Sequence, residues 1–170
     1  MTKSLRTLDG LRVLLVEDDD DTREVLTLGL TLYGAEVVAV SRAADAMLEL
    51  QKSAPDVILS DIGLPDEDGL ALIRRIRQLP PSRGGRVPAV AVTAFTLGED
   101  AEEAIRAGFQ RHFRKPVDTQ ALFGAVAALA HSGRVERRRR ARRLLRVLRD
   151  ERPSTTERRT DFERRTLLLA

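Results

Sequence analysis

Short apolar segments alternate with longer amphipathic ones along residues 11–130. Short apolar segments are typical of buried strands, whereas apolar residues spaced three and four apart indicate helices. We expect strands at residues 11–16, 36–40, 56–60, 87–92 and 109–113. We expect helices at residues 22–33, 42–52, 70–79, 99–107 and 119–130. Glycine or proline follows several of these helices, as Gly34 and Pro55 do, and would end them.

Two of the predicted helices show their apolar residues clearly. In the first, Val25, Leu26, Leu28 and Leu32 form a rough helical stripe, and Asp21 is the expected N-cap because its carboxylate can accept from a free backbone amide. In the third, residues 70–79 carry Leu72, Ile73 and Ile76 on one side.

The five strand–helix repeats predict an α/β fold with a five-stranded, doubly wound parallel sheet covered by helices. In such sheets, ligands bind at the carboxyl ends of the strands. The residues that follow each strand are therefore the candidate site.

Polar side chains follow four of the five predicted strands. Glu17 and Asp18 follow the first, Asp61 the third, Thr93 the fourth and Lys115 the fifth. Three carboxylates close together repel one another, and a hard divalent cation such as Mg²⁺, bound through oxygens, would offset that repulsion. A carboxylate can also act as a nucleophile and form an aspartyl-phosphate, with a hydroxyl and an ammonium beside the phosphoryl group.

Four motifs carry a family resemblance. VLLVEDD, PDVILSDIGLPDEDGL, VAVTA and HFRKPVD, in this order, resemble the receiver domain of two-component response regulators over about residues 11–130. The resemblance implies the flavodoxin-like receiver fold, with Asp61 as the phosphoacceptor. It also implies a Mg²⁺ site made by Asp18 and Asp61, the backbone carbonyl of Gly63, and Glu17 acting through water.

The resemblance assigns the switch residues as well. Thr93 matches the switch hydroxyl that follows the phosphoryl group, and Lys115 matches the ammonium, with Pro116 expected in a cis bond. The family often has Tyr or Phe three residues before the lysine, whereas this sequence has His112, whose charge would add pH dependence. The stretch GFQRHFRKPVD is similar to receivers attached to hybrid histidine kinases.

The resemblance further implies a response regulator that accepts a phosphoryl group on Asp61 from a histidine kinase or a phosphorelay protein. Phosphorylation would switch a surface that binds a downstream protein. The expected catalysis is limited to the domain's own phosphorylation and dephosphorylation, so the protein is not expected to be an enzyme on other substrates. Phosphatases and phosphotransferases that use an aspartyl-phosphate usually carry a second Asp two residues after the nucleophile, and Gly63 at that position argues against this class.

Composition excludes several other classes. The 170 residues suffice for one domain of ordinary size, and the absence of cysteine excludes disulfides, thiol catalysis and Cys-ligated metals. No apolar run is long enough for a transmembrane helix, and the N-terminus lacks the apolar core of a signal peptide. We therefore expect a cytoplasmic protein.

The charge divides the chain. Residues 1–130 hold 15 basic and 20 acidic residues, whereas residues 131–170 hold 14 arginines and six acidic residues. Together with the small residues near His131 and Gly133, this predicts an N-terminal segment (1–10), a receiver domain (11–131) and a basic extension (132–170). The extension is expected to form a helix over 134–151, ended by Pro153, and then to be disordered.

Three interpretations of the extension stay open. It could be a solvated continuation of the last helix, or a surface for an acidic partner, including the receiver of another subunit in a homodimer. It could also contact nucleic acid or an anionic membrane, which would make the protein a DNA-binding or membrane-surface regulator. The sequence favours this last alternative less, because it shows no helix-turn-helix and no aromatic membrane anchors.

Overall fold

The computed structural model describes residues 7–94 and 98–150. It contains the strands β1 (Arg12–Val16), β2 (Glu36–Val40), β3 (Val57–Asp61), β4 (Ala89–Thr93) and β5 (Arg111–Arg114). These strands form one parallel sheet in the order β2-β1-β3-β4-β5. This order confirms the predicted doubly wound sheet of the flavodoxin-like type.

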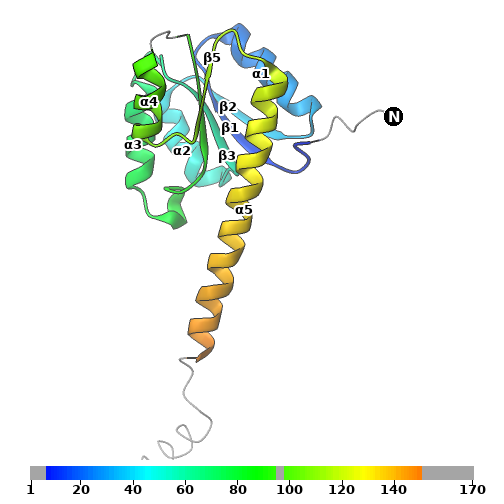
Figure 1. The fold of residues 1–170 in the computed structure, drawn as a ribbon, viewed down its shortest axis with the longest axis vertical. Helices are drawn as coiled ribbons and strands as arrows, with labels where there is room; N and C mark the ends of the chain where they lie inside the picture. Colours follow the sequence, from blue (N-terminus) through cyan, green and yellow to red (C-terminus); the bar gives the residue numbers. More distant parts are fainter. Residues whose placement is uncertain (1–6, 95–97, 151–170) are drawn as a thin grey trace, which may run out of the picture. The chain divides into compact units, whose positions relative to one another are not determined.

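Helices lie on both faces of the sheet (Figure 1). They are α1 (Asp20–Leu32), α2 (Ala43–Ser53), α3 (Gly69–Gln78), α4 (Gly98–Ala107) and α5 (Thr119–Asp150), with a short 3₁₀ helix at Pro81–Arg83. No helix within the described residues is both long enough and apolar enough to cross a bilayer.

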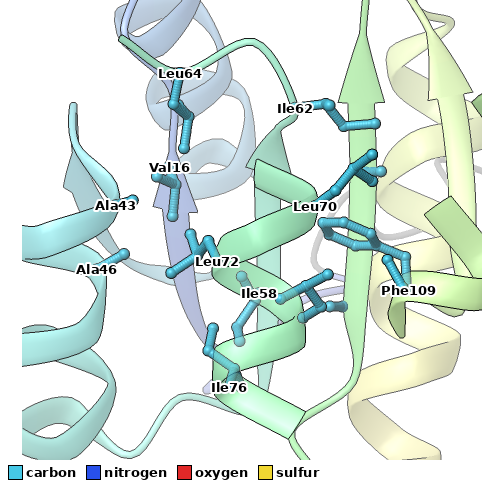
Figure 2. Close-up of a cluster of buried hydrophobic side chains, with 14 of the residues drawn as sticks. Val16, Ala43, Ala46, Ile58, Ile62, Leu64, Leu70, Leu72, Ile76 and Phe109 are labelled. Carbon is cyan, nitrogen blue, oxygen red and sulfur yellow. The ribbon is translucent and has the colours of Figure 1, made fainter. Parts of the chain in front are cut away.

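The sheet separates two apolar cores. Along β1, Val13 and Leu15 pack with residues of α1 and α5, whereas Leu14 and Val16 pack with residues of α2, α3 and α4. Successive side chains of a strand point to opposite faces, so a strand buried on both faces must be apolar at every position. Figure 2 shows the second core, in which side chains of α3 and of the sheet interleave.

The apolar stripe predicted for the first helix is largely wrong. The residues that α1 buries are Leu26 and Leu30, one turn apart, whereas Val25, Leu28 and Leu32 are exposed. The predicted N-cap is wrong as well, because Asp19 caps α1 by accepting from the Thr22 amide at 2.8 Å, which places Asp21 inside the first turn. The hydrophobic pattern alone could not reveal which face of α1 meets the sheet.

The helices predicted at residues 119–130 and 134–151 are not separate, because α5 runs without interruption from Thr119 to Asp150. Gly133 instead allows a close approach to Pro88, since a Cβ atom added at Gly133 would lie 3.2 Å from two atoms of the proline ring. The chain forms two compact units, and the division falls inside α5, between Arg134 and Val135. The disorder expected after residue 151 concerns residues outside the described part of the chain.

The packed domain begins before the first strand. Leu8 is fully buried in the core formed with α1 and α5, and its amide donates to the Tyr33 carbonyl at 3.0 Å. Part of the predicted N-terminal segment 1–10 therefore packs in the core, while residues 1–6 lie outside the described part.

Candidate functional site

The carboxyl ends of the parallel strands bring together residues from distant parts of the sequence. Asp61 is the last residue of β3 and Thr93 the last of β4, while Glu17 directly follows β1 and Lys115 directly follows β5. Each of these side chains was predicted from its position after a strand.

Three carboxylates form the centre of the site. One oxygen from each of Glu17, Asp18 and Asp61 lies within 4.8 Å of the other two. Glu17 is 1% exposed and Asp61 is 8% exposed, whereas Asp18 is the most open of the three. Crowded, desolvated carboxylates require a nearby positive charge.

Lys115 supplies a positive charge to this cluster. Its Nζ lies 2.6 Å from Oδ2 of Asp61 and 2.9 Å from a carboxylate oxygen of Glu17. Burial lowers the pKa of Lys115, but its hydrogen bonds to Asp61 and Glu17, together with the negative charges of both carboxylates, raise the pKa more, so that the net pKa is above its usual value. The ammonium is therefore charged at neutral pH.

Glu17 responds differently to the same surroundings. Burial raises the pKa of Glu17 above its usual value, and the hydrogen bond from Lys115 and its charge only partly compensate. One lysine therefore does not fully compensate for the mutual repulsion of the carboxylates and for the cost of burying their charges. The oxygen-only donor set fits a hard cation such as Mg²⁺.

The backbone around Lys115 ties the ends of two strands together. The Lys115 amide donates to the Thr93 carbonyl at 2.8 Å, and Thr93 is fully buried. The Lys115–Pro116 peptide bond is cis, as predicted from the resemblance. The ammonium that contacts Asp61 and the amide that holds the end of β4 thus belong to one residue.

The loop that follows Asp61 lies in close contact with the end of β3. The Gly63 amide donates to Oδ1 of Asp61 at 3.0 Å, so the two carboxylate oxygens have different partners. A Cβ atom added at Gly69 would lie 2.3 Å from the Asp61 carbonyl oxygen, which leaves room only for glycine. Sequence reasoning missed Gly69, because its role depends on how α3 approaches β3.

Sequence reasoning also missed the role of Asp66. The N-cap residue of α2, Arg42, makes no capping hydrogen bond through its side chain. Instead, the two oxygens of Asp66 accept from the amides of Ala43 and Ala44, each at 3.1 Å. The loop that carries Gly63 is thereby fixed to a neighbouring helix.

His112 lies on β5 in register with Ala91, two residues before Thr93 on the neighbouring strand. Its Nε2 atom is buried and finds no hydrogen-bond partner among the described residues. The residue as a whole is half-buried.

Comparisons with known proteins agree with the fold. The sequence matches the family described as "Response regulator receiver domain" over residues 13–127. It is 38% identical over 122 residues to the "uncharacterized 14.6 kDa protein in sodA1 3′ region" of Leptolyngbya boryana, covering 72% of this chain and 92% of that protein. It is 34% identical over 135 residues to the sensor histidine kinase RcsC of Salmonella typhi, covering 79% of this chain but only 14% of the kinase.

A solved receiver domain also has the fold of this chain. The receiver domain of the sensor histidine kinase PA1611 from Pseudomonas aeruginosa PAO1 is 31% identical and superposes with a TM-score of 0.65, covering 72% of this chain and 98% of that domain. That structure has a magnesium ion coordinated in its active-site cleft. Because the family match includes Asp18, Asp61 and Lys115 and covers more than half of the sequence, this chain belongs to the response regulator receiver domain family of two-component signalling.

Proposed function

We propose that this protein is a phosphoryl-accepting switch in which Asp61 is the phosphoacceptor. The observation that carries the proposal is the buried Asp61 carboxylate, held 2.6 Å from the Lys115 ammonium and beside two further carboxylates. The phosphodonor is a histidine kinase or a histidine phosphotransfer protein, in keeping with the similarity to a histidine kinase. The proposed site of action is the cytoplasm.

The residues that would hold Mg²⁺ are Asp18 and Asp61 directly, Glu17 through water, and Gly63 through its carbonyl. When bound, the ion would offset the negative charge of the carboxylates and of the incoming phosphoryl group. Burial and the charge of Asp61 raise the pKa of Glu17, and a bound cation would help to keep this carboxylate ionised.

The proposed reaction is a simple displacement. An Asp61 carboxylate oxygen attacks phosphorus, the bond from phosphorus to the imidazole nitrogen of the donor breaks, and that nitrogen keeps the electron pair and gains a proton from solvent. Lys115 then pairs with an oxygen of the new phosphoryl group, and the Thr93 hydroxyl donates to another. Hydrolysis of the acyl phosphate by water restores Asp61.

The chain's catalysis would be limited to these two reactions on itself. Gly63 supports this limit, since it stands where phosphatases with an aspartyl-phosphate carry a second Asp. The output would pass through α4, β5 and α5, because Thr93 ends the strand before α4 and the Lys115 amide holds the Thr93 carbonyl. Movement of Thr93 toward a phosphoryl group would alter this surface and with it the affinity for a downstream protein.

The test is the intact mass of the protein after incubation with Mg²⁺ and acetyl phosphate. We expect the wild type to gain one phosphoryl group, Asp61→Asn to gain none, and a chelator added beforehand to prevent the gain. Asp45→Asn, which changes an exposed residue of α2, is the matched control and should react like the wild type. An unmodified wild type, under conditions where a known receiver is modified, would overturn the proposal.

A further inference from the structure

Six of the exposed large apolar side chains lie on two helical segments. On α1 they are Val25, Leu28 and Leu32, which are 59–67% exposed. On the part of α5 beyond Arg134 they are Val135, Leu144 and Leu145, which are 50–66% exposed. Exposed apolar residues are unremarkable when scattered, but clusters of them mark binding surfaces.

The exposed side of α1 is acidic. Val25, Leu28 and Leu32 recur at intervals of three and four and so lie on one side of the helix. Asp21 and Glu24 border this row, and Leu28 lines a surface hollow together with Asp20, Arg23 and Glu24. The Arg23 guanidinium is paired with Asp20 and with two carbonyls, so it leaves the acidic character of this side in place.

The exposed helical segment 135–146 has the opposite charge. It contains seven arginines and a single acidic residue, Glu136. Ala141, Leu144 and Leu145 fall at intervals of three and four, so they lie on one side of the helix, and arginines flank them along the sequence. Every residue from Val135 to Arg146 is exposed.

We propose that α1 of one molecule binds segment 135–146 of a second copy of this chain. Leu144 and Leu145 would cover Val25, Leu28 and Leu32, while flanking arginines would pair with Asp21 and Glu24. Two copies could exchange these contacts, which doubles the buried surface in the closed symmetric arrangement usual for homodimers. Pairing of two basic segments with each other is disfavoured, because each carries a net charge of +6.

A second copy explains more of these observations than the other occupants do. A nucleic acid duplex would use the arginines through its phosphates and leave the leucines exposed. An anionic membrane would accept both the arginines and the leucines, but it would leave the apolar row of α1 uncovered. A second copy covers both apolar clusters and pairs both sets of charges.

The test is sedimentation equilibrium of the full chain over about a hundredfold range of concentration, because association depends on concentration by mass action. We expect a monomer–dimer equilibrium that weakens as salt is added. Leu144→Ala with Leu145→Ala, Glu24→Arg alone and Arg142→Glu alone should each raise the dissociation constant about tenfold, the equivalent of 1.4 kcal/mol. Glu24→Arg combined with Arg142→Glu should restore much of the affinity.

Matched controls lie on α2, which covers the other face of the sheet. Leu48→Ala removes an apolar side chain that is 57% exposed, and Glu49→Arg reverses a surface charge. Neither substitution should change the dissociation constant. Circular dichroism of each variant would show that it is folded.

Three results would overturn the proposal. The first is a chain that stays monomeric at all concentrations. The second is a dimer that responds equally to the α2 controls and to the variants of α1 and α5. The third is a monomer that binds phosphatidylserine vesicles or a DNA duplex with loss of binding in Arg142→Glu, which would assign segment 135–146 to those ligands instead.

Discussion

Gly69 lies so close to Asp61 that no side chain fits between the start of α3 and the end of β3. A Cβ atom at position 69 would stand 2.3 Å from the Asp61 carbonyl oxygen and 2.8 Å from Cα of Ile62. The position of the Asp61 carboxylate therefore depends on a residue eight positions further along the chain.

Gly69→Ala should accordingly destabilise the fold and slow modification of Asp61. Forcing a methyl group against backbone atoms displaces α3 or the loop, and overpacking of this kind costs about 1–3 kcal/mol. Urea unfolding would measure the stability, and intact mass would measure the rate of phosphorylation. The matched control is Gly124→Ala, where an added Cβ atom meets nothing within 4 Å and helix propensity should stabilise α5. Equal effects of the two substitutions would contradict the close contact.

Asp66 gives a prediction about pH. The slight burial of Asp66 raises its pKa, but the hydrogen bonds from the amides of Ala43 and Ala44 outweigh this, so the pKa of Asp66 is below its usual value. A carboxylate with a lowered pKa stabilises the fold at pH values above its unfolded pKa, and this stabilisation disappears as pH falls through the folded pKa.

Asp66→Ala should therefore lose about 1 kcal/mol at neutral pH, the usual cost of removing a helix cap. The wild type and the variant should converge in stability below the usual titration range of aspartate. Urea unfolding from pH 7 to pH 3 would show this, with Asp66→Asn as the variant that keeps one acceptor oxygen. A stability difference that does not shrink at acidic pH would contradict the capping role.

The carboxylate cluster predicts stabilisation by Mg²⁺. An ion that binds only the folded chain adds about 1.4 kcal/mol to the free energy of unfolding at ten times its dissociation constant. Asp18→Asn and Asp61→Asn should reduce or abolish this gain, which thermal unfolding with and without a chelator would measure. Asp45→Asn should respond to the ion as the wild type does. An equal gain in all four proteins would place the ion elsewhere.

Substitution of His112 is expected to stabilise the fold. Its Nε2 atom is buried without a hydrogen-bond partner in the described part of the chain. A buried polar atom that loses its hydrogen bonds to water and gains none in the protein lowers the free energy of unfolding. His112→Phe should therefore raise the free energy of unfolding by about 1 kcal/mol, whereas His131→Phe on the exposed side of α5 should change it by less than about 0.5 kcal/mol. A loss of stability in His112→Phe would show that the nitrogen has a partner such as water.

The sequence allowed the sheet and most of the site to be predicted, because both depend on local patterns. A strand buried on both faces is largely apolar, so its end is visible, and Glu17 and Asp61 could be found by their positions at the ends of such segments. Lys115 was found from the motif HFRKPVD, because β5 is polar at both ends and only half-buried between them. The parallel order then places these ends at one edge.

The errors arose where packing between distant segments decides the outcome. The apolar content of α1 could not show that Leu30 is buried while Leu28 is exposed, since that depends on which face meets the sheet. The small residues near Gly133 separated two predicted helices, whereas in the structure Gly133 lies within the single helix α5 and allows a close contact with Pro88. The roles of Asp66 and Gly69 likewise depend on neighbours that lie far away in the sequence or belong to the backbone.

The division of the interior by the sheet has a consequence for how the domain tolerates substitutions. Ile76 of α3 and Leu30 of α1 are both fully buried, yet they belong to separate cores on opposite faces of the sheet. Their effects on the free energy of unfolding should therefore add to within about 0.5 kcal/mol in Ile76→Val, Leu30→Ala and the double variant. Independent cores let substitutions accumulate on the α1 and α5 side, while the packing of α3 beneath Asp61 stays unchanged.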